Sequence, residues 1–127
     1  MSATPFAPIV RSFPHDADFS SSQWLIVKAN GDTDLDICGA GEQPYGVLSS
    51  NVEDGSSTAS KSDVQIGGQI KVEAGATVAR GAAVMSNAAG EAITGTDGNW
   101  CLGYALSGGA DGELISVNFG PFYLETT

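Results

Sequence analysis

The sequence has few of the side chains from which catalytic and metal-binding sites are built. It contains one histidine, His15, and two cysteines, Cys38 and Cys101. Nucleophilic catalysis by a triad needs a Ser, Cys or Thr beside a base that is usually His. His15 lies in a proline-rich segment, which is a poor frame for a rigid catalytic geometry, and two cysteines without neighbouring histidines do not make a zinc site. We therefore expect no enzymatic activity, no metal and no other cofactor.

Basic residues are also scarce, since 5 Lys and Arg stand against 15 Asp and Glu and give a net charge of −10. Nucleic-acid binding requires Lys and Arg to neutralise phosphates, and anionic membranes attract the same residues. The basic residues are scattered and form no patch in the sequence. We therefore expect neither nucleic acid nor a membrane as partner, and we interpret the acidity as a source of solubility through self-repulsion.

Long hydrophobic runs are missing. No apolar run approaches the ~20 residues of a transmembrane helix, and the N-terminus has neither the basic nor the apolar region of a secretory signal. If the chain is complete, we expect it to be made and kept in a cytosol-like compartment. There Cys38 and Cys101 are expected to stay buried thiols rather than to form a disulfide.

Three aspartates, Asp32, Asp34 and Asp36, are spaced like the start of a calcium loop. An EF-hand requires Gly at the sixth position and Glu at the twelfth, where this chain has Ile37 and Gln43. On a strand, Asp34 and Asp36 share one face and the apolar residues between them face the core. We interpret the aspartates as a solvated face, with weak cation binding as the alternative.

Glycine is abundant, with 17 residues in a chain of 127. Glycine weakens helices but supplies the positive φ angles of tight turns. Segments with a helical period do not exceed about two turns, and the one candidate spans residues 76–83. Short alternating segments between Gly-rich turns predict an all-β fold, a small β-sandwich or barrel of short antiparallel strands.

Two parts of the chain, residues 45–67 and residues 102–120, are alike. Each has a short apolar strand with a glycine near its start, a turn (Asp54-Gly55 or Asp111-Gly112), and a return strand with alternating apolar residues. This pattern predicts two hairpins.

The return strand of the first hairpin extends over residues 64–72 and contains Gly67-Gly68, which predicts a bulge or a sharp bend. Pro121 is expected to end the ladder of the second hairpin, leaving an apolar tail at residues 122–124.

Residues 1–22 are expected to form an extended Pro-rich N-terminal arm, followed by a single β domain over residues 23–127. Pro5, Pro8 and Pro14 exclude a regular helix and a central strand. The arm either packs along its own domain, or reaches a neighbouring subunit and becomes ordered on binding. Its candidate interaction residues are apolar: Phe6, Ile9, Val10, Phe13 and Phe19.

The order of small and apolar residues between positions 25 and 120 also carries a family resemblance. A Gly-led apolar strand at 46–48 is followed by the strand at 64–68 and by an Ala-Gly-rich stretch at 74–85 that ends in an apolar strand. The segments 102–105 and 117–119 complete the pattern. In this order the chain resembles the small capsid cement, or head decoration, proteins of tailed bacteriophages.

The resemblance implies a structural role. Such a protein binds the outer surface of the expanded icosahedral capsid at three-fold and quasi-three-fold positions, as a homotrimer, and stabilises the shell. Its partners would be the major capsid protein and its own copies. Its location would be the outer capsid surface of the virion, after synthesis in the host cytoplasm. The family brings no catalytic residue.

The alternative is a β-sandwich module of a virion tail or adhesin that binds carbohydrate or protein. Trp24, Tyr45, Trp100 and Tyr104 can stack on a sugar ring, or they can fill the core. We favour the core interpretation, because large aromatic side chains contribute most of their stabilisation when buried.

Overall fold

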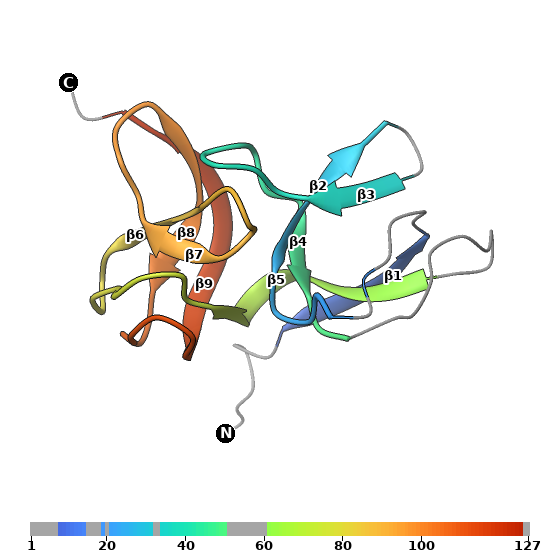
Figure 1. Ribbon diagram of the computed structural model, residues 1–127, viewed down its shortest axis with the longest axis horizontal. Coiled ribbons are helices and arrows are strands. Elements are labelled where there is room, and N and C mark those ends of the chain that lie inside the picture. The colour runs from blue at the N-terminus through green and yellow to red at the C-terminus, as the bar shows by residue number, and fades with distance from the viewer. Residues whose placement is uncertain (1–7, 15–18, 20, 32–33, 51–60, 126–127) are drawn as a thin grey trace.

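The computed structural model describes residues 8–14, 19, 21–31, 34–50 and 61–125 (Figure 1). These residues form nine β-strands and no helix, which confirms the predicted all-β class. No described helix is therefore long and apolar enough to cross a membrane. The strands are β1 (Ile9–Pro14), β2 (Ile26–Asn30), β3 (Asp34–Ile37), β4 (Gly46–Leu48), β5 (Lys61–Glu73), β6 (Ala83–Ser86), β7 (Ala92–Thr94), β8 (Asn99–Ala105) and β9 (Leu114–Leu124).

The strand β5 is shared between two halves of one antiparallel sheet. The strand order is β3-β2-β4-β5-β9-β8-β6-β7, and β1 pairs with β5 outside this path. Up to Gly67, β5 pairs with β1 and β4; from Gly68 onward it pairs with β9. Figure 1 accordingly shows β1 to β4 on one side of the molecule and β6 to β9 on the other.

The half that contains β6 to β9 curls back towards β5. Ala74, directly after β5, forms an isolated bridge with Ala92 of β7, and Gly75 N donates a hydrogen bond to Ala92 O at 2.8 Å. A second bridge joins Val78 to Gly109 in the β8–β9 connection. These links give this half a barrel-like form. Residues 76–83, the one helical candidate of the sequence, form turns and a bridge.

Two hydrophobic clusters lie on opposite faces of β2 and β4. Ile26 and Val47 belong to the larger cluster, whereas their neighbours Val27 and Leu48 belong to the smaller one. Strand β4 and the start of β2 are therefore buried on both faces and join the two halves. The larger cluster also includes Cys38, Ile70, Val72, Ala74, Val78, Val84, Ala92, Leu102, Ala105, Ile115 and Val117. The smaller one also includes Phe19, Leu35 and Val64, with Phe13, Ile37 and Ile66 packed against it.

The bend predicted at Gly67-Gly68 is confirmed. Gly68 has a φ of 76°, in the region that favours glycine, and β5 changes its partner strands at this point. The bend brings the buried side chain of Gln65 over the backbone of Lys71. Gln65 Nε2 donates to Lys71 O at 2.9 Å, and Lys71 N donates to Gln65 Oε1 at 3.0 Å. The Gln65 amide thus pairs with the backbone of β5 as a neighbouring strand would.

The strand pairs of the two predicted hairpins are also present, because β4 pairs with β5 and β8 pairs with β9. The predicted Asp54-Gly55 turn lies outside the described residues. Each hairpin needs a glycine at one position, Gly46 or Gly103, because the partner strand comes too close there for a side chain. A Cβ atom at Gly46 would lie 2.7 Å from Gln65 O, and one at Gly103 would overlap Asn118 O across the ladder. In both hairpins only glycine permits this close approach of the strands.

The expectation that Pro121 ends the ladder is wrong, because β9 continues pairing with β8 up to Leu124. Cys101 lies opposite Phe122 and Gly103 lies opposite Phe119, so β9 has one residue more than β8 in this interval. The extra residue of a bulge is unpaired, and a bulge therefore tolerates a residue without an N–H group.

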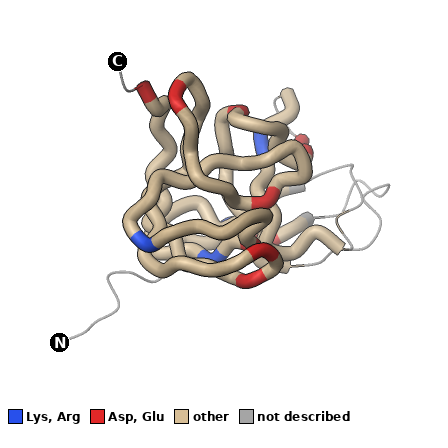
Figure 2. Tube along the Cα trace, turned by 60° about the vertical axis from the view of Figure 1, so that its left-hand side comes forward, with Lys and Arg blue, Asp and Glu red and all other residues tan. Residues whose placement is uncertain are grey.

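Charged residues are distributed unevenly over the chain trace. Figure 2 shows the Lys and Arg segments apart from one another and most Asp and Glu segments in turns or near chain ends. The strands themselves are mostly uncharged.

Candidate interaction surfaces

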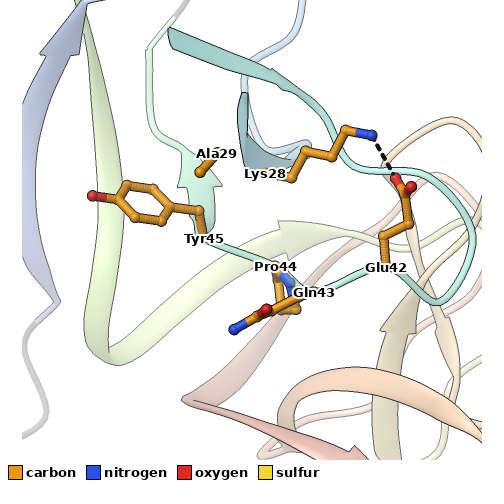
Figure 3. A pocket seen from close by; sticks show the side chains of 6 residues that line it. All are labelled: Lys28, Ala29, Glu42, Gln43, Pro44 and Tyr45. Carbon is orange, nitrogen blue, oxygen red and sulfur yellow. Dashed lines mark hydrogen bonds and ion pairs between the residues drawn. The ribbon is translucent and has the colours of Figure 1, made fainter. Parts of the chain in front are cut away.

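A shallow hollow lies beside an ion pair between β2 and the loop that follows β3 (Figure 3). Lys28 Nζ donates to Glu42 Oε1 at 2.8 Å, and Gly39 N donates to the same oxygen at 2.7 Å. The hydrogen bond with Lys28 lowers the pKa of Glu42, and the same contact raises the pKa of Lys28. The two charges are paired with each other, while the Tyr45 ring points away from them. The hollow therefore offers no unpaired charge to a ligand.

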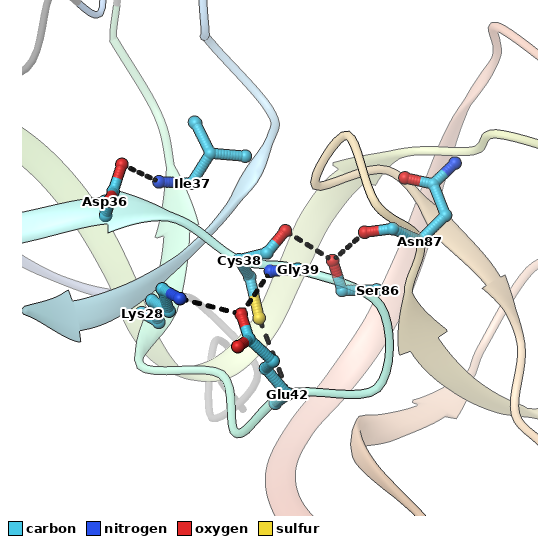
Figure 4. Close-up of polar contacts among 8 residues, drawn as sticks. All are labelled: Lys28, Asp36, Ile37, Cys38, Gly39, Glu42, Ser86 and Asn87. Atoms are coloured by element: carbon cyan, nitrogen blue, oxygen red, sulfur yellow. Dashed lines mark hydrogen bonds and ion pairs between the residues drawn. The ribbon is translucent and has the colours of Figure 1, made fainter.

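A polar network next to this pair ties the loop after β3 to β6 (Figure 4). Ser86 Oγ lies 3.2 Å from Cys38 O and 2.8 Å from Asn87 O and can donate to either carbonyl. Cys38 Sγ donates to Glu42 O at 3.4 Å. Burial raises the pKa of the Cys38 thiol to about 11, so the thiol stays protonated and is a poor nucleophile.

Both cysteines are free and buried, which confirms the prediction of two thiols without a disulfide. Asp34 and Asp36 have a local structural role on β3. Asp34 Oδ1 accepts from Leu35 N at 2.8 Å, and Asp36 Oδ1 accepts from Ile37 N at 3.0 Å. These carboxylates accept the hydrogen bonds of backbone N–H groups on the outer edge of β3. The N–H groups are then not free to pair with another strand, which protects the edge.

The described residues contain no group of three His, Cys, Asp or Glu side chains arranged to hold a metal ion. Asp32 and His15 lie outside the described residues.

The five candidate residues of the arm divide into three groups. Phe6 lies outside the described residues. Phe19 is 1% exposed and belongs to the smaller hydrophobic cluster, and Phe13 packs against that cluster. Ile9 and Val10 are 52% and 43% exposed on β1. Phe13 and Phe19 thus pack along their own domain, whereas Ile9 and Val10 remain available at the surface.

A second hollow, here called the β1 hollow, lies between β1, the turn before β2, β5 and β9. Apolar atoms make up most of its lining, and Lys71 carries the only charge among its described residues. Trp24 has a φ of 75°, which a residue with a side chain rarely adopts. Trp24 N donates to Leu48 O at 2.7 Å and Glu73 N donates to Trp24 O at 3.0 Å, and these bonds hold that conformation. The lining residues are Pro8, Val10, Trp24, Ser49, Gln65, Gln69, Lys71 and Ser116.

A third surface, here called the outer strip, lies on the outward face of β8 and β9. Tyr104 is 53% exposed and stacks on Phe122, with ring centroids 5.1 Å apart and planes at 16°. The strand register places Leu106 and Leu114 on the same face, and both are exposed. The strip consists of Tyr104, Leu106, Leu114 and Phe122, with the uncharged Ser116 and Asn118 between them.

Trp24, Tyr45, Trp100 and Tyr104 do not fill the core, contrary to the interpretation favoured from the sequence. Tyr45 and Tyr104 are exposed and the two tryptophans are half-buried. Trp100 contacts Tyr123 edge-to-face at 5.8 Å. Alternation of apolar and polar residues along a strand predicts which side chains share a face. It does not predict the bulge near Pro121, which shifts the register of β9 against β8 and so decides which aromatic residues of the two strands lie next to each other.

Comparison with known proteins identifies a similar fold. No protein-family model matches the sequence, and no curated protein matches it. Among solved structures, the N base of the head fiber protein gp8.5 of bacteriophage phi29 superimposes with a TM-score of 0.67 at 15% sequence identity. The match covers 94% of this chain and 100% of that one. The chain therefore has the fold of that head fiber base.

Proposed function

We propose that the protein is a structural component of a phage head that attaches to the outer surface of the capsid as a decoration, or cement, protein. The observation that carries this proposal is the fold similarity, which extends over 94% of this chain and the whole phi29 head fiber base. The resemblance of residues 25–120 to capsid cement proteins supports it from the sequence. The role requires neither catalysis nor a cofactor, and its partners are the major capsid protein and further copies of this chain.

In the detailed form of the proposal, a homotrimer binds at three-fold and quasi-three-fold positions of the expanded shell. Each copy buries surface across a junction between capsid subunits. Three linked copies bind more strongly than one, because the second and third contacts form at a high effective concentration. A protein that fits the expanded shell better than the unexpanded one stabilises the expanded state.

The direct test is co-sedimentation of the purified protein with expanded capsids of the phage that encodes it. We expect saturable binding to expanded capsids lacking this protein, and virions in which its copy number, measured by mass spectrometry, approaches that of the shell protein. Absence from purified virions together with no binding to expanded capsids would contradict the proposal.

The exposed aromatic residues favour one alternative, a carbohydrate- or protein-binding module of a tail or adhesin. Tyr104 stacks on Phe122 and lies opposite Asn118, and an aromatic face beside an amide is a combination that suits a sugar ring. Binding of the isolated protein on a glycan array, lost in Tyr104→Ala, would support this alternative.

A further inference from the structure

The β1 hollow contains polar side chains that the fold itself does not use. The Gln65 amide is already paired with the backbone of Lys71. By contrast, the side chains of Gln69, Lys71 and Ser116 make no hydrogen bond or ion pair with another described residue. Lys71 lies directly opposite Ser116, and Gln69 lines the hollow two residues before Lys71 on the same strand. A few available polar groups that converge in a largely apolar hollow are typical of a ligand site.

The apolar wall of the hollow includes a residue in a strained conformation. Trp24 has a φ of 75°, which glycine or asparagine adopts at a lower cost than a bulky residue does. Backbone strain of this kind is concentrated at sites that bind ligands. The half-buried indole of Trp24 lines the hollow. The strain therefore indicates that this position has an indole for the sake of the hollow rather than for the turn.

The hollow and the outer strip form one continuous surface. Ser116 belongs to both, and Gln69 of β5 lies opposite Asn118 of β9, which lies opposite Tyr104 of β8. Two strand spacings separate Gln69 from Tyr104, on the order of 10 Å. A ligand in the hollow must therefore be longer than a single ring to reach the strip. Lys71 carries the only charge among the described residues of this whole surface.

We propose that this surface binds an oligosaccharide whose carboxylated sugar lies in the β1 hollow and whose neutral sugars continue over the outer strip. The indole of Trp24 stacks on the apolar face of the first sugar ring. The Lys71 ammonium pairs with the carboxylate of that sugar, while the side chains of Gln69 and Ser116 hydrogen-bond with its hydroxyl groups. The next sugars contact Asn118 and the exposed ring of Tyr104.

The distribution of charge selects this kind of ligand. The hollow has one available cation, Lys71, and the strip has no charged residue. A ligand with one carboxylate followed by neutral sugars matches this pattern. A polyanion does not, because the chain has a net charge of −10 and repels it. Sugar binding goes beyond the proposed role on the phage head and does not depend on it.

The test is isothermal titration calorimetry of the full chain with sialyllactose, in which the carboxylated sugar N-acetylneuraminic acid is joined to the neutral disaccharide lactose. We expect sialyllactose to bind about tenfold or more tightly than N-acetylneuraminic acid alone, because linked sugars add contacts with the strip. Lactose alone should bind more weakly than sialyllactose. Hexanoate, an apolar chain with a carboxylate, should bind more weakly than N-acetylneuraminic acid, because it offers no hydroxyl group to Gln69 or Ser116.

Variants of the hollow test the assigned contacts, with folding checked by circular dichroism. Trp24→Asn removes the indole and suits the positive φ, and Lys71→Gln changes an exposed side chain. Each should weaken sialyllactose binding about tenfold or more. The matched controls remove an exposed aromatic and an exposed cation outside the surface, in Tyr45→Ser and Arg80→Gln, and should bind as the wild type does.

A strip variant and a fluorescence titration locate the two ends of the ligand. Tyr104→Ser should weaken the binding of sialyllactose but leave the binding of N-acetylneuraminic acid unchanged, because the single sugar does not reach the strip. In a Trp100→Phe variant the remaining tryptophan is Trp24. Its fluorescence should change in a saturable way with N-acetylneuraminic acid, since the sugar lies against its ring.

Several results would overturn the inference: no binding of sialyllactose, equal binding of lactose and sialyllactose, hexanoate binding as tightly as N-acetylneuraminic acid, or unchanged binding in Trp24→Asn or Lys71→Gln. Co-sedimentation with expanded capsids is measured separately on the wild type. Capsid binding without sugar binding would contradict only this inference. Sugar binding through Trp24 and Lys71 without capsid binding would support this inference and contradict only the proposed function.

Discussion

Burial keeps the cysteine thiols neutral. Both side chains are inaccessible, and burial raises the pKa of Cys38 to about 11 and also raises the pKa of Cys101. At pH 8 only about one Cys38 thiol in a thousand would be ionised, and the thiolate is the reactive form. These two residues therefore serve packing and the polar network rather than chemistry.

This leads to a prediction for thiol labelling. With a disulfide reagent at pH 8, the native protein should react many times more slowly than the protein unfolded in guanidinium, where both thiols should react. Cys38→Ser and Cys101→Ser assign each phase to its residue. Rapid stoichiometric labelling of the native protein would contradict the buried placement.

Among the described carboxylates, Glu73 is the one whose pKa the fold raises. Burial raises its pKa, and the nearby Glu91 and Asp111 raise it further. The folded state therefore penalises the ionised form, and this penalty develops as the pH rises from the unfolded pKa through the higher folded pKa. Below both pKa values the penalty is absent.

Glu73→Gln should accordingly raise the free energy of unfolding at pH 7 by up to ~0.5 kcal/mol, the usual range for surface changes. At pH 4 the gain should largely disappear, because the carboxyl of the wild type is then mostly protonated in the folded state. Denaturant melts at both pH values measure the difference, and Glu125→Gln at the exposed C-terminal end of β9 serves as control. An equal gain at both pH values would exclude charge as the cause.

At the scale of elements, the glycines of the two hairpins are the sharpest test of the fold. Gly103 has a φ of 149°, and a Cβ atom there would overlap Asn118 O. Gly103→Ala should cost about 3 kcal/mol or more, since it adds a forbidden φ to a backbone collision. Gly120→Ala is the matched control on β9, where a Cβ atom meets nothing within 4 Å.

Chemical denaturation of both variants gives the comparison. The control should change the midpoint little, whereas Gly103→Ala should lower it strongly or prevent folding. Similar midpoints for the two variants would show that β8 and β9 do not approach as closely at Gly103 as the structure has them.

The sequence was informative where structure depends on neighbours along the chain. The hairpins and the bend at Gly67-Gly68 follow from glycine positions and alternating residues, and all were predicted. The pairing of β1 with β5 was not, because Val10 meets Gln65 across a separation that no local pattern encodes. The bulge at Pro121 was missed because its effect depends on the partner strand β8.

The interaction surfaces were predicted least well, for the same reason. Composition identified the aromatic residues but not their exposure, which depends on how strands from distant parts of the chain cover one another. Phe13 and Phe19 were candidates for binding a neighbour, yet Phe19 belongs to the smaller hydrophobic cluster and Phe13 of β1 packs against it. Among the described candidate residues of the arm, only Ile9 and Val10 are exposed.

At the scale of the whole molecule, the structure has consequences for any truncation of the arm. Deleting residues 2–19 would remove β1 and the buried Phe19 as well as the exposed residues. Loss of a buried phenylalanine typically costs 3–5 kcal/mol, so such a truncation would test stability rather than binding. Point substitutions at the exposed Val10 avoid this problem.

The last prediction concerns the shell to which the protein is proposed to bind. A ligand stabilises the state that it binds more tightly, by an amount that grows with ligand concentration above its dissociation constant. Adding the protein to expanded capsids that lack it should therefore raise their dissociation temperature in a saturable way, while unexpanded capsids should respond little. Differential scanning fluorimetry across a concentration series measures both shells, with bovine serum albumin at equal mass as control. Equal shifts for the two shells would contradict preferential binding to the expanded state, because a ligand with equal affinity for two states cannot favour either.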